Sequence, residues 1–109
     1  MLQIYADIQE FQVDARELVV RRIGSHDSHL ASQLRRSAQA VALNTAEGMG
    51  ARGAVRRNLY SIALREAKEC VAAIDVARRW EYVPPTSDDV LDRLDKIVAT
   101  LFRLTTPRR

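Results

Sequence analysis

The residues most suggestive of chemistry form one run near the middle of the chain, Gly48-Met49-Gly50-Ala51-Arg52-Gly53. They match the G-x-G-x-x-G pattern of a dinucleotide-binding loop, in which glycines let the backbone approach a pyrophosphate at the start of a helix. That pattern binds a dinucleotide only when a β-strand precedes it and an α-helix follows. Its meaning therefore depends on the elements that flank it.

The segment before the glycines has the period of a helix rather than a strand. An acid about 20 residues further on, Asp75, matches the usual ribose-binding position but also lies in a helical pattern. A P-loop fails because Ala54-Val55 replaces the required Lys-Ser/Thr pair. We therefore expect a turn between two helices, with Gly48 in the left-handed conformation of a helix C-cap.

Other candidates for catalysis or metal binding are weak. His26 and His29 flank Asp27, but no further histidine, cysteine or paired carboxylate stands at a recognisable ligand spacing. Ser25-His26-Asp27 contains the residue types of a catalytic triad, yet adjacent residues cannot converge as a triad requires. The single cysteine, Cys70, falls on an apolar stripe and is expected in the core. The sequence thus predicts a protein without enzymatic activity, cofactor or metal.

Length and composition limit the possible architectures. The chain has 109 residues, of which 47% are hydrophobic, with only four glycines and three prolines, a balance that favours packed helices in one domain over residues 1–109. One cysteine excludes an intrachain disulfide, and neither a signal peptide nor an apolar run of about 20 residues is evident. We expect a cytoplasmic protein that does not enter a membrane.

Apolar periodicity and helix-breaking residues predict four helices, over roughly residues 4–23, 28–47, 53–81 and 87–104. Asp27 or Ser28 is expected to cap the second helix, and Thr86 or Ser87 the fourth. Short connections make consecutive helices antiparallel. The predicted fold class is all-α, an up-down-up-down four-helix bundle.

The third predicted helix has an apolar arc nearly twice as wide as one core requires. Its second stripe should be exposed in a single bundle, and exposed apolar patches usually mark interfaces. We therefore expect a homo-oligomer, although a more central position of this helix would also explain the arc. The predicted interface residues are Tyr60, Leu64, Ala67 and Val71.

Basic residues are concentrated in the middle of the chain. Fifteen of the 17 basic residues are arginines, and between Ser28 and Lys68 seven basic residues face two acids. Guanidinium groups suit phosphates, and repetition of such a surface around an oligomer would bind a nucleic-acid backbone without reading bases. Solvated helix faces would explain the same pattern. The candidate nucleic-acid-binding residues are Arg35, Arg36, Arg52, Arg56, Arg57, Arg65 and Lys68.

Three polar residues are expected to have structural roles: Asn44, Glu47 and Glu66. Glu66 falls on an apolar stripe of the third helix, so it should pair with an arginine or with a polar partner such as Asn44 or Ser37. We expect a structural link there rather than a catalytic acid.

Four stretches together resemble the four-helix-bundle family of 23S ribosomal RNA intervening-sequence proteins: "YADIQEFQ" (5–12), "QLRRSAQAVALNTAEG" (33–48), "LYSIALREAKE" (59–69) and "WEYV" (80–83). The resemblance covers nearly the whole chain. Its most specific elements are Gln33-Leu34-Arg35-Arg36, Asn44-x-Ala46-Glu47-Gly48 and Tyr5-x-Asp7. The chain departs from the family at Ala40-Val41-Ala42, where Ser-Ile-Pro is usual, and at Arg65-Glu66, where Gly-Ser is usual.

The resemblance implies bundles that assemble into a ring, most simply a pentamer, but it implies no chemistry. The family is similar to the accessory variability determinants of diversity-generating retroelements, which implies a basic ring that binds nucleic acid. Two hypotheses follow. One is a non-enzymatic ring that binds RNA or DNA backbone, and the other is an oligomeric scaffold that docks a protein partner.

Overall fold

Helices account for nearly all of the part of the chain that the computed structural model describes, residues 3–84 and 88–106. Within these residues there is no β-strand. The predicted all-α class is therefore confirmed, while the predicted caps of the fourth helix, Thr86 and Ser87, lie outside the described residues. The elements are α1 (Gln3–Glu17), the π-helical segment η1 (Leu18–Ile23), α2 (Ser28–Met49), α3 (Gly53–Arg79) and α4 (Asp88–Thr105).

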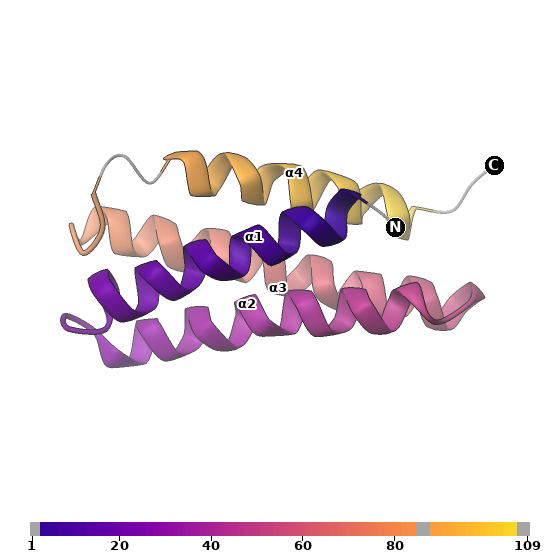
Figure 1. Ribbon diagram of the computed structural model, residues 1–109, viewed down its shortest axis with the longest axis horizontal. Helices are drawn as coiled ribbons and strands as arrows, with labels where there is room; N and C mark the ends of the chain where they lie inside the picture. Colours follow the sequence, from indigo (N-terminus) through magenta and orange to yellow (C-terminus); the bar gives the residue numbers. More distant parts are fainter. Residues whose placement is uncertain (1–2, 85–87, 107–109) are drawn as a thin grey trace.

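The helices lie side by side along the long axis of an elongated body, 44 × 21 × 20 Å (Figure 1). The turn from η1 to α2 lies at the same end as the last residues of α3 and the first of α4 (Figure 1). The turn from α2 to α3 lies at the opposite end. Residues far apart in sequence, such as Arg22 and Arg79, are thereby brought to one end of the molecule.

Each helix contributes one apolar face to a shared core, as the periodicity predicts. The apolar stripe that begins in α1 and continues into η1 is buried at each of its positions from Ile4 to Leu18. The predicted stripe of α4 is also confirmed, because its central residues are fully buried and its ends half-buried. The largest fully buried side chains include Ile8, Phe11, Ile23, Leu34, Val41, Cys70, Ile74, Leu94, Ile97 and Leu101.

The last six residues of the first predicted helix are π-helical, which the sequence pattern does not indicate. The amide of Gly24 donates a 2.9 Å hydrogen bond to the carbonyl of Val19, five residues earlier. Such i to i+5 bonds bring residues five apart onto one face. Leu18 and Ile23, separated by five positions, are accordingly both buried.

The start of α2 is capped as predicted. A carboxylate oxygen of Asp27 accepts a 2.9 Å hydrogen bond from the amide of Leu30, three residues into the turn. This bond satisfies one of the amides that a helix N-terminus leaves without an intrahelical partner. Asp27, rather than Ser28, is therefore the N-cap residue.

The prediction that Gly48 is a left-handed C-cap is wrong. α2 continues through Gly48 to Met49, and Gly48 is buried. A Cβ atom at this position would lie 2.5 Å from Cε1 of Tyr60, a ring that is itself only 3% exposed. Glycine is needed here for close approach of α3. The left-handed conformation occurs instead at Gly53, with φ +56°, where α3 begins.

We predict that Gly48→Ala lowers the free energy of unfolding by about 1–2 kcal/mol, measured by urea denaturation. Overpacking against the Tyr60 ring costs about 1–3 kcal/mol, and the better helix propensity of alanine offsets up to about 1 kcal/mol of this. Gly50→Ala is the matched control, since its Cβ would meet nothing nearer than 3.7 Å and should change stability by less than about 0.5 kcal/mol. A Gly48→Ala protein as stable as the parent would contradict the packing argument.

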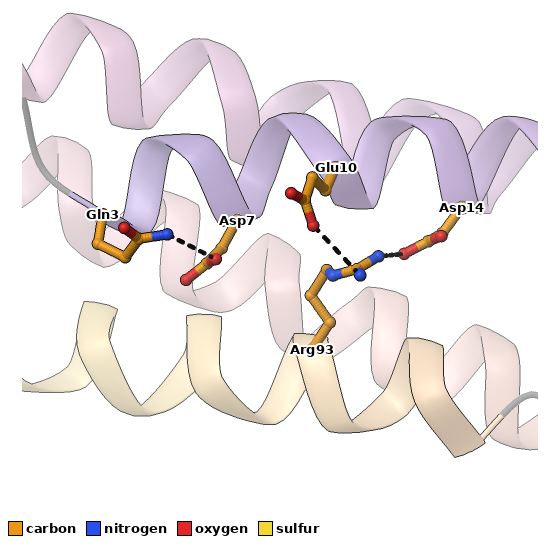
Figure 2. A network of polar contacts seen from close by, with 5 residues as sticks. All are labelled: Gln3, Asp7, Glu10, Asp14 and Arg93. Atoms are coloured by element: carbon orange, nitrogen blue, oxygen red, sulfur yellow. Dashed lines mark hydrogen bonds and ion pairs between the residues drawn. The ribbon is translucent and has the colours of Figure 1, made fainter.

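Arg93 connects α4 to α1 through two carboxylates. Its guanidinium donates to Asp14 and lies 3.2 Å from Glu10, one turn earlier on α1 (Figure 2). The Arg93 side chain is 33% exposed and that of Asp14 only 23%. Partial burial strengthens such a charge-assisted contact relative to a fully solvated pair.

Arg93→Ala should therefore lower the free energy of unfolding by about 1 kcal/mol. Arg103→Ala on the same helix is the control, because Arg103 is exposed and, among residues 3–84 and 88–106, hydrogen-bonds only to Thr100 one turn away. Thermal denaturation of the two variants at low ionic strength separates the loss of the Arg93 contacts from the general effect of removing an arginine from α4. Equal stability of both would show that the Arg93 contacts contribute nothing measurable.

Candidate nucleic-acid interface

The seven basic residues predicted to contact nucleic acid are all exposed. They lie on two adjacent helices and the turn between them, and we call this set the basic band. Its members are Arg35 and Arg36 on α2, Arg52 in the turn, and Arg56, Arg57, Arg65 and Lys68 on α3.

Three of the four α3 members of the basic band share one face of the helix, and Arg56 lies outside it. Arg57, Arg65 and Lys68 are spaced by eight and three residues, so they share a helix face and extend over about 16 Å. Arg79, which the sequence places on the same face, lies about 33 Å from Arg57 along the helix at 1.5 Å per residue. It lines a hollow at the other end of the bundle and does not join the basic band.

A hydrogen bond fixes the register between the two helices of the basic band. Ser37 on α2 donates to Oε2 of Glu69 on α3, at 3.2 Å. The positive charges of Arg36 and Arg65 both act on the neighbouring carboxyl of Glu66. These two arginines, 29 residues apart in sequence, are thus brought to the same level of the bundle.

At the end of the basic band near the α2–α3 turn, one of its arginines bonds to the backbone of α2. Nε of Arg56 donates a 3.1 Å hydrogen bond to the carbonyl of Gly48, near the end of α2. Helix ends leave such carbonyls without intrahelical partners, and a cation there also interacts favourably with the helix dipole. Arg56 therefore has a structural role, whereas Arg52 and Arg57 make no comparable contact within the described residues.

The basic band carries positive charge without carboxylate partners. In residues 3–84 and 88–106, none of its seven side chains lies within 4.0 Å of an acidic group. The arginines that do form ion pairs lie elsewhere: Arg21, Arg78 and Arg93.

The predicted partners of Glu66 are wrong in part. Ser37 bonds to Glu69, not Glu66, and the side chain of Asn44 donates to the carbonyl of Ala40 on its own helix. Glu66 lies beside Glu69 instead, three residues further along the same helix. Glu47 is exposed at the end of α2.

Desolvation raises the pKa of Glu66 above its ordinary value of 4.5. A hydrogen bond with Glu69 and the negative charge of that residue act in the same direction, while Arg65 and Arg36 oppose them. Burial, together with both carboxyls, also raises the pKa of the Cys70 thiol to about 12. A thiol with that pKa, fully buried in the core, is no nucleophile at neutral pH.

The raised pKa of Glu66 makes stability depend on pH. The folded chain holds this proton more tightly than the unfolded chain, so the free energy of unfolding should decline as pH rises from 4.5 through the raised pKa. Glu66→Gln removes the titrating group and should flatten this decline in denaturation curves measured between pH 4 and 8. Glu47→Gln, which alters an exposed carboxyl, is the control. An unchanged slope in the Glu66→Gln protein would contradict the assignment.

The stripe of α3 expected to form an oligomer interface is only partly accessible. Tyr60 is 3% exposed and Ala67 0% exposed within the single chain, so the expectation that they would remain exposed is wrong. α3 contacts both α2 and α4, and its wide apolar arc covers both neighbours. Leu64 and Val71 are half-buried at the edge of the core.

One group of basic residues is missed by the sequence reasoning. Arg21-Arg22 ends η1 and Arg78-Arg79 ends α3, and all four line a surface hollow at one end of the bundle. In the sequence this group is visible only as two arginine pairs, each near the end of a helix. Only the tertiary structure shows that the pairs meet, because the last residues of η1 and of α3 lie at the same end of the bundle (Figure 1).

No helix of the described residues has the length and apolar character needed to cross a bilayer.

The comparisons with known proteins bear on the fold. The family model described as "23S rRNA-intervening sequence protein" matches residues 1–103. A crystal structure of a protein of unknown function from the S23 ribosomal protein family of Bacteroides thetaiotaomicron is similar in structure, with a TM-score of 0.86. The two sequences are 21% identical, and the match covers 95% of this chain and 99% of the other. No match is found among the curated proteins.

Proposed function

The chain belongs to the 23S rRNA-intervening sequence protein family, and we propose that it is a non-enzymatic protein that binds the backbone of RNA or DNA through the basic band. The observation that carries this proposal is the exposure of seven basic side chains without a carboxylate partner in the described residues. Displacement of counterions from phosphates by such groups favours binding without base recognition.

The proposal includes assembly into a homo-oligomeric ring, most simply a pentamer of up-down-up-down bundles in the cytoplasm. Repetition of the basic band around a ring would let one molecule contact several phosphates at once, which raises avidity without new contacts. Because Tyr60 and Ala67 are buried within one chain, the half-buried Leu64 and Val71 are the members of the predicted interface that remain available. A relation to the accessory variability determinants of diversity-generating retroelements belongs to the same proposal.

Fluorescence anisotropy against structured RNA and duplex DNA, over a range of salt concentrations, tests this function. Affinity should fall steeply with salt, and the triple variant Arg57→Ala/Arg65→Ala/Lys68→Ala should reduce the slope of log K against log salt by about 2–3. The three side chains are exposed and form no ion pair in the described chain, so the variant should fold. Light scattering fixes the mass of each sample.

The matched control replaces a basic residue outside the basic band, Arg103→Ala, and should leave the salt slope unchanged. Absence of binding at low salt would overturn the proposal. That result would favour an oligomeric scaffold that docks a protein partner.

A further inference from the structure

The arginine pairs of η1 and α3 border a hollow of about 770 Å³ at the end of the bundle opposite the α2–α3 turn. We call it the basic hollow. This volume lies within the range of small-molecule sites. Its lining combines basic, acidic and aromatic groups: Arg21, Arg22, His26, Asp75, Arg78, Arg79, Glu81, Tyr82, Val83 and Pro84.

Two of the four arginines in the basic hollow already have partners. Arg21 pairs with Glu17 at 2.8 Å, and Arg78 with Asp88 at 3.0 Å. Arg22 and Arg79 form no ion pair within the described residues and are exposed. The lining holds four arginines and two acids, and because Glu17 and Asp88 balance Arg21 and Arg78, the guanidinium groups left for a bound anion are those of Arg22 and Arg79.

Two aromatic rings, those of His26 and Tyr82, line the basic hollow, and a third, that of Trp80, lies beside the lining, between Arg79 and Glu81 in the chain. His26 stacks on Tyr82 with ring centroids 5.0 Å apart and planes 6° apart. Trp80 stacks on the same tyrosine at 6.3 Å and 25°. Although Tyr82 is half-buried, the indole of Trp80 is 68% exposed, an unusual state for the largest apolar side chain. Its ring is therefore available for a further flat partner.

The conformation of the chain between these rings is itself held in place. Glu81 has φ +61°, in the left-handed region that non-glycine residues rarely adopt. Hydrogen bonds from the Tyr82 amide to the carbonyl of Ala77, at 2.8 Å, and from the Glu81 amide to that of Arg78, at 3.0 Å, fix this turn. The turn presents Trp80 and Tyr82 together, beside the arginines at the end of α3.

We propose that a nucleotide with an unpaired base binds at the basic hollow, its phosphate held by Arg22 and Arg79 of the lining and its base stacked on Trp80, which lies outside the lining beside Tyr82. Guanidinium forks match phosphate oxygens, and base–aromatic stacking tolerates any base because every base has a flat face. An inorganic anion would use the arginines and leave the indole exposed. A nucleotide uses both groups, which is why we favour it.

The site is separate from the basic band. Arg57 and Arg79 lie about 33 Å apart along α3. A substitution that abolishes binding at one surface should therefore leave binding at the other intact. A free nucleotide and an unpaired position within a strand offer the same phosphate and base, so the two sources share the same contacts.

Trp80 is the only tryptophan of the chain, so its fluorescence reports stacking directly. We expect adenosine 5′-monophosphate to quench it at concentrations at least about tenfold lower than adenosine, because only the former carries a phosphate. Ribose 5-phosphate should compete without quenching. A five-residue oligoadenylate that binds more tightly than the mononucleotide identifies a strand as the source, and the reverse identifies the free nucleotide.

Variants separate the two halves of the site. Arg22→Ala/Arg79→Ala should weaken the mononucleotide at least about tenfold, whereas Arg103→Ala and the triple variant of the basic band should not. By calorimetry, Trp80→Ala should weaken the mononucleotide at least about fivefold and leave ribose 5-phosphate unchanged.

Three results would overturn the proposal. The first is that the mononucleotide does not quench the fluorescence of Trp80 at low salt. The second is that the parent protein binds the mononucleotide and ribose 5-phosphate with equal affinity. The third is a change of mass in the Trp80→Ala protein by light scattering, which would place the indole in a contact between copies.

Discussion

The close approach of α2 and α3 is the constraint on which the rest of this structure depends. Small residues on both helices make it possible, and Gly48 is the extreme case because any side chain there would overlap the buried ring of Tyr60. Interiors pack as densely as organic crystals, so this contact limits how the two longest helices can rotate against each other. The bond from Ser37 to Glu69 then sets their register. With the small residues turned inward, Arg36 and Arg65 can only lie on the outer surface.

The arginines of this bundle fall into two groups with different chemistry. Some are bound to carboxylates and stabilise the arrangement of helices, as Arg93 does between α4 and α1. The basic band and part of the basic hollow have no such partner in the described chain. Unpaired guanidinium groups repel one another and contribute little to folding, so their clustering is better explained by an external anion than by stability. This contrast is the physical basis of both proposals.

Membership of the 23S rRNA-intervening sequence protein family explains the fold and leaves the chemistry open. The interior of this bundle is filled mainly by apolar side chains and Cys70, with Ser37 and Thr45 as buried polar residues. Charged and aromatic side chains gather at the ends of the helices as well as on their faces. At one end the turn is closed by Arg56, and at the other the aromatic rings around Tyr82 stand beside arginines.

The sequence by itself determined the helices, their apolar faces, a cap of α2 at Asp27 or Ser28 and the exposure of the basic band, because periodicity and capping depend on residues a turn apart. Only the tertiary structure decided the role of Gly48, the π-helical end of the first helix, the pairing of Ser37 with Glu69 and the convergence of aromatic rings on Tyr82. These features depend on how helices rotate against one another, and a one-residue change in register alters every such contact. Local patterns carry no information about that rotation, which the packing of all four helices sets together.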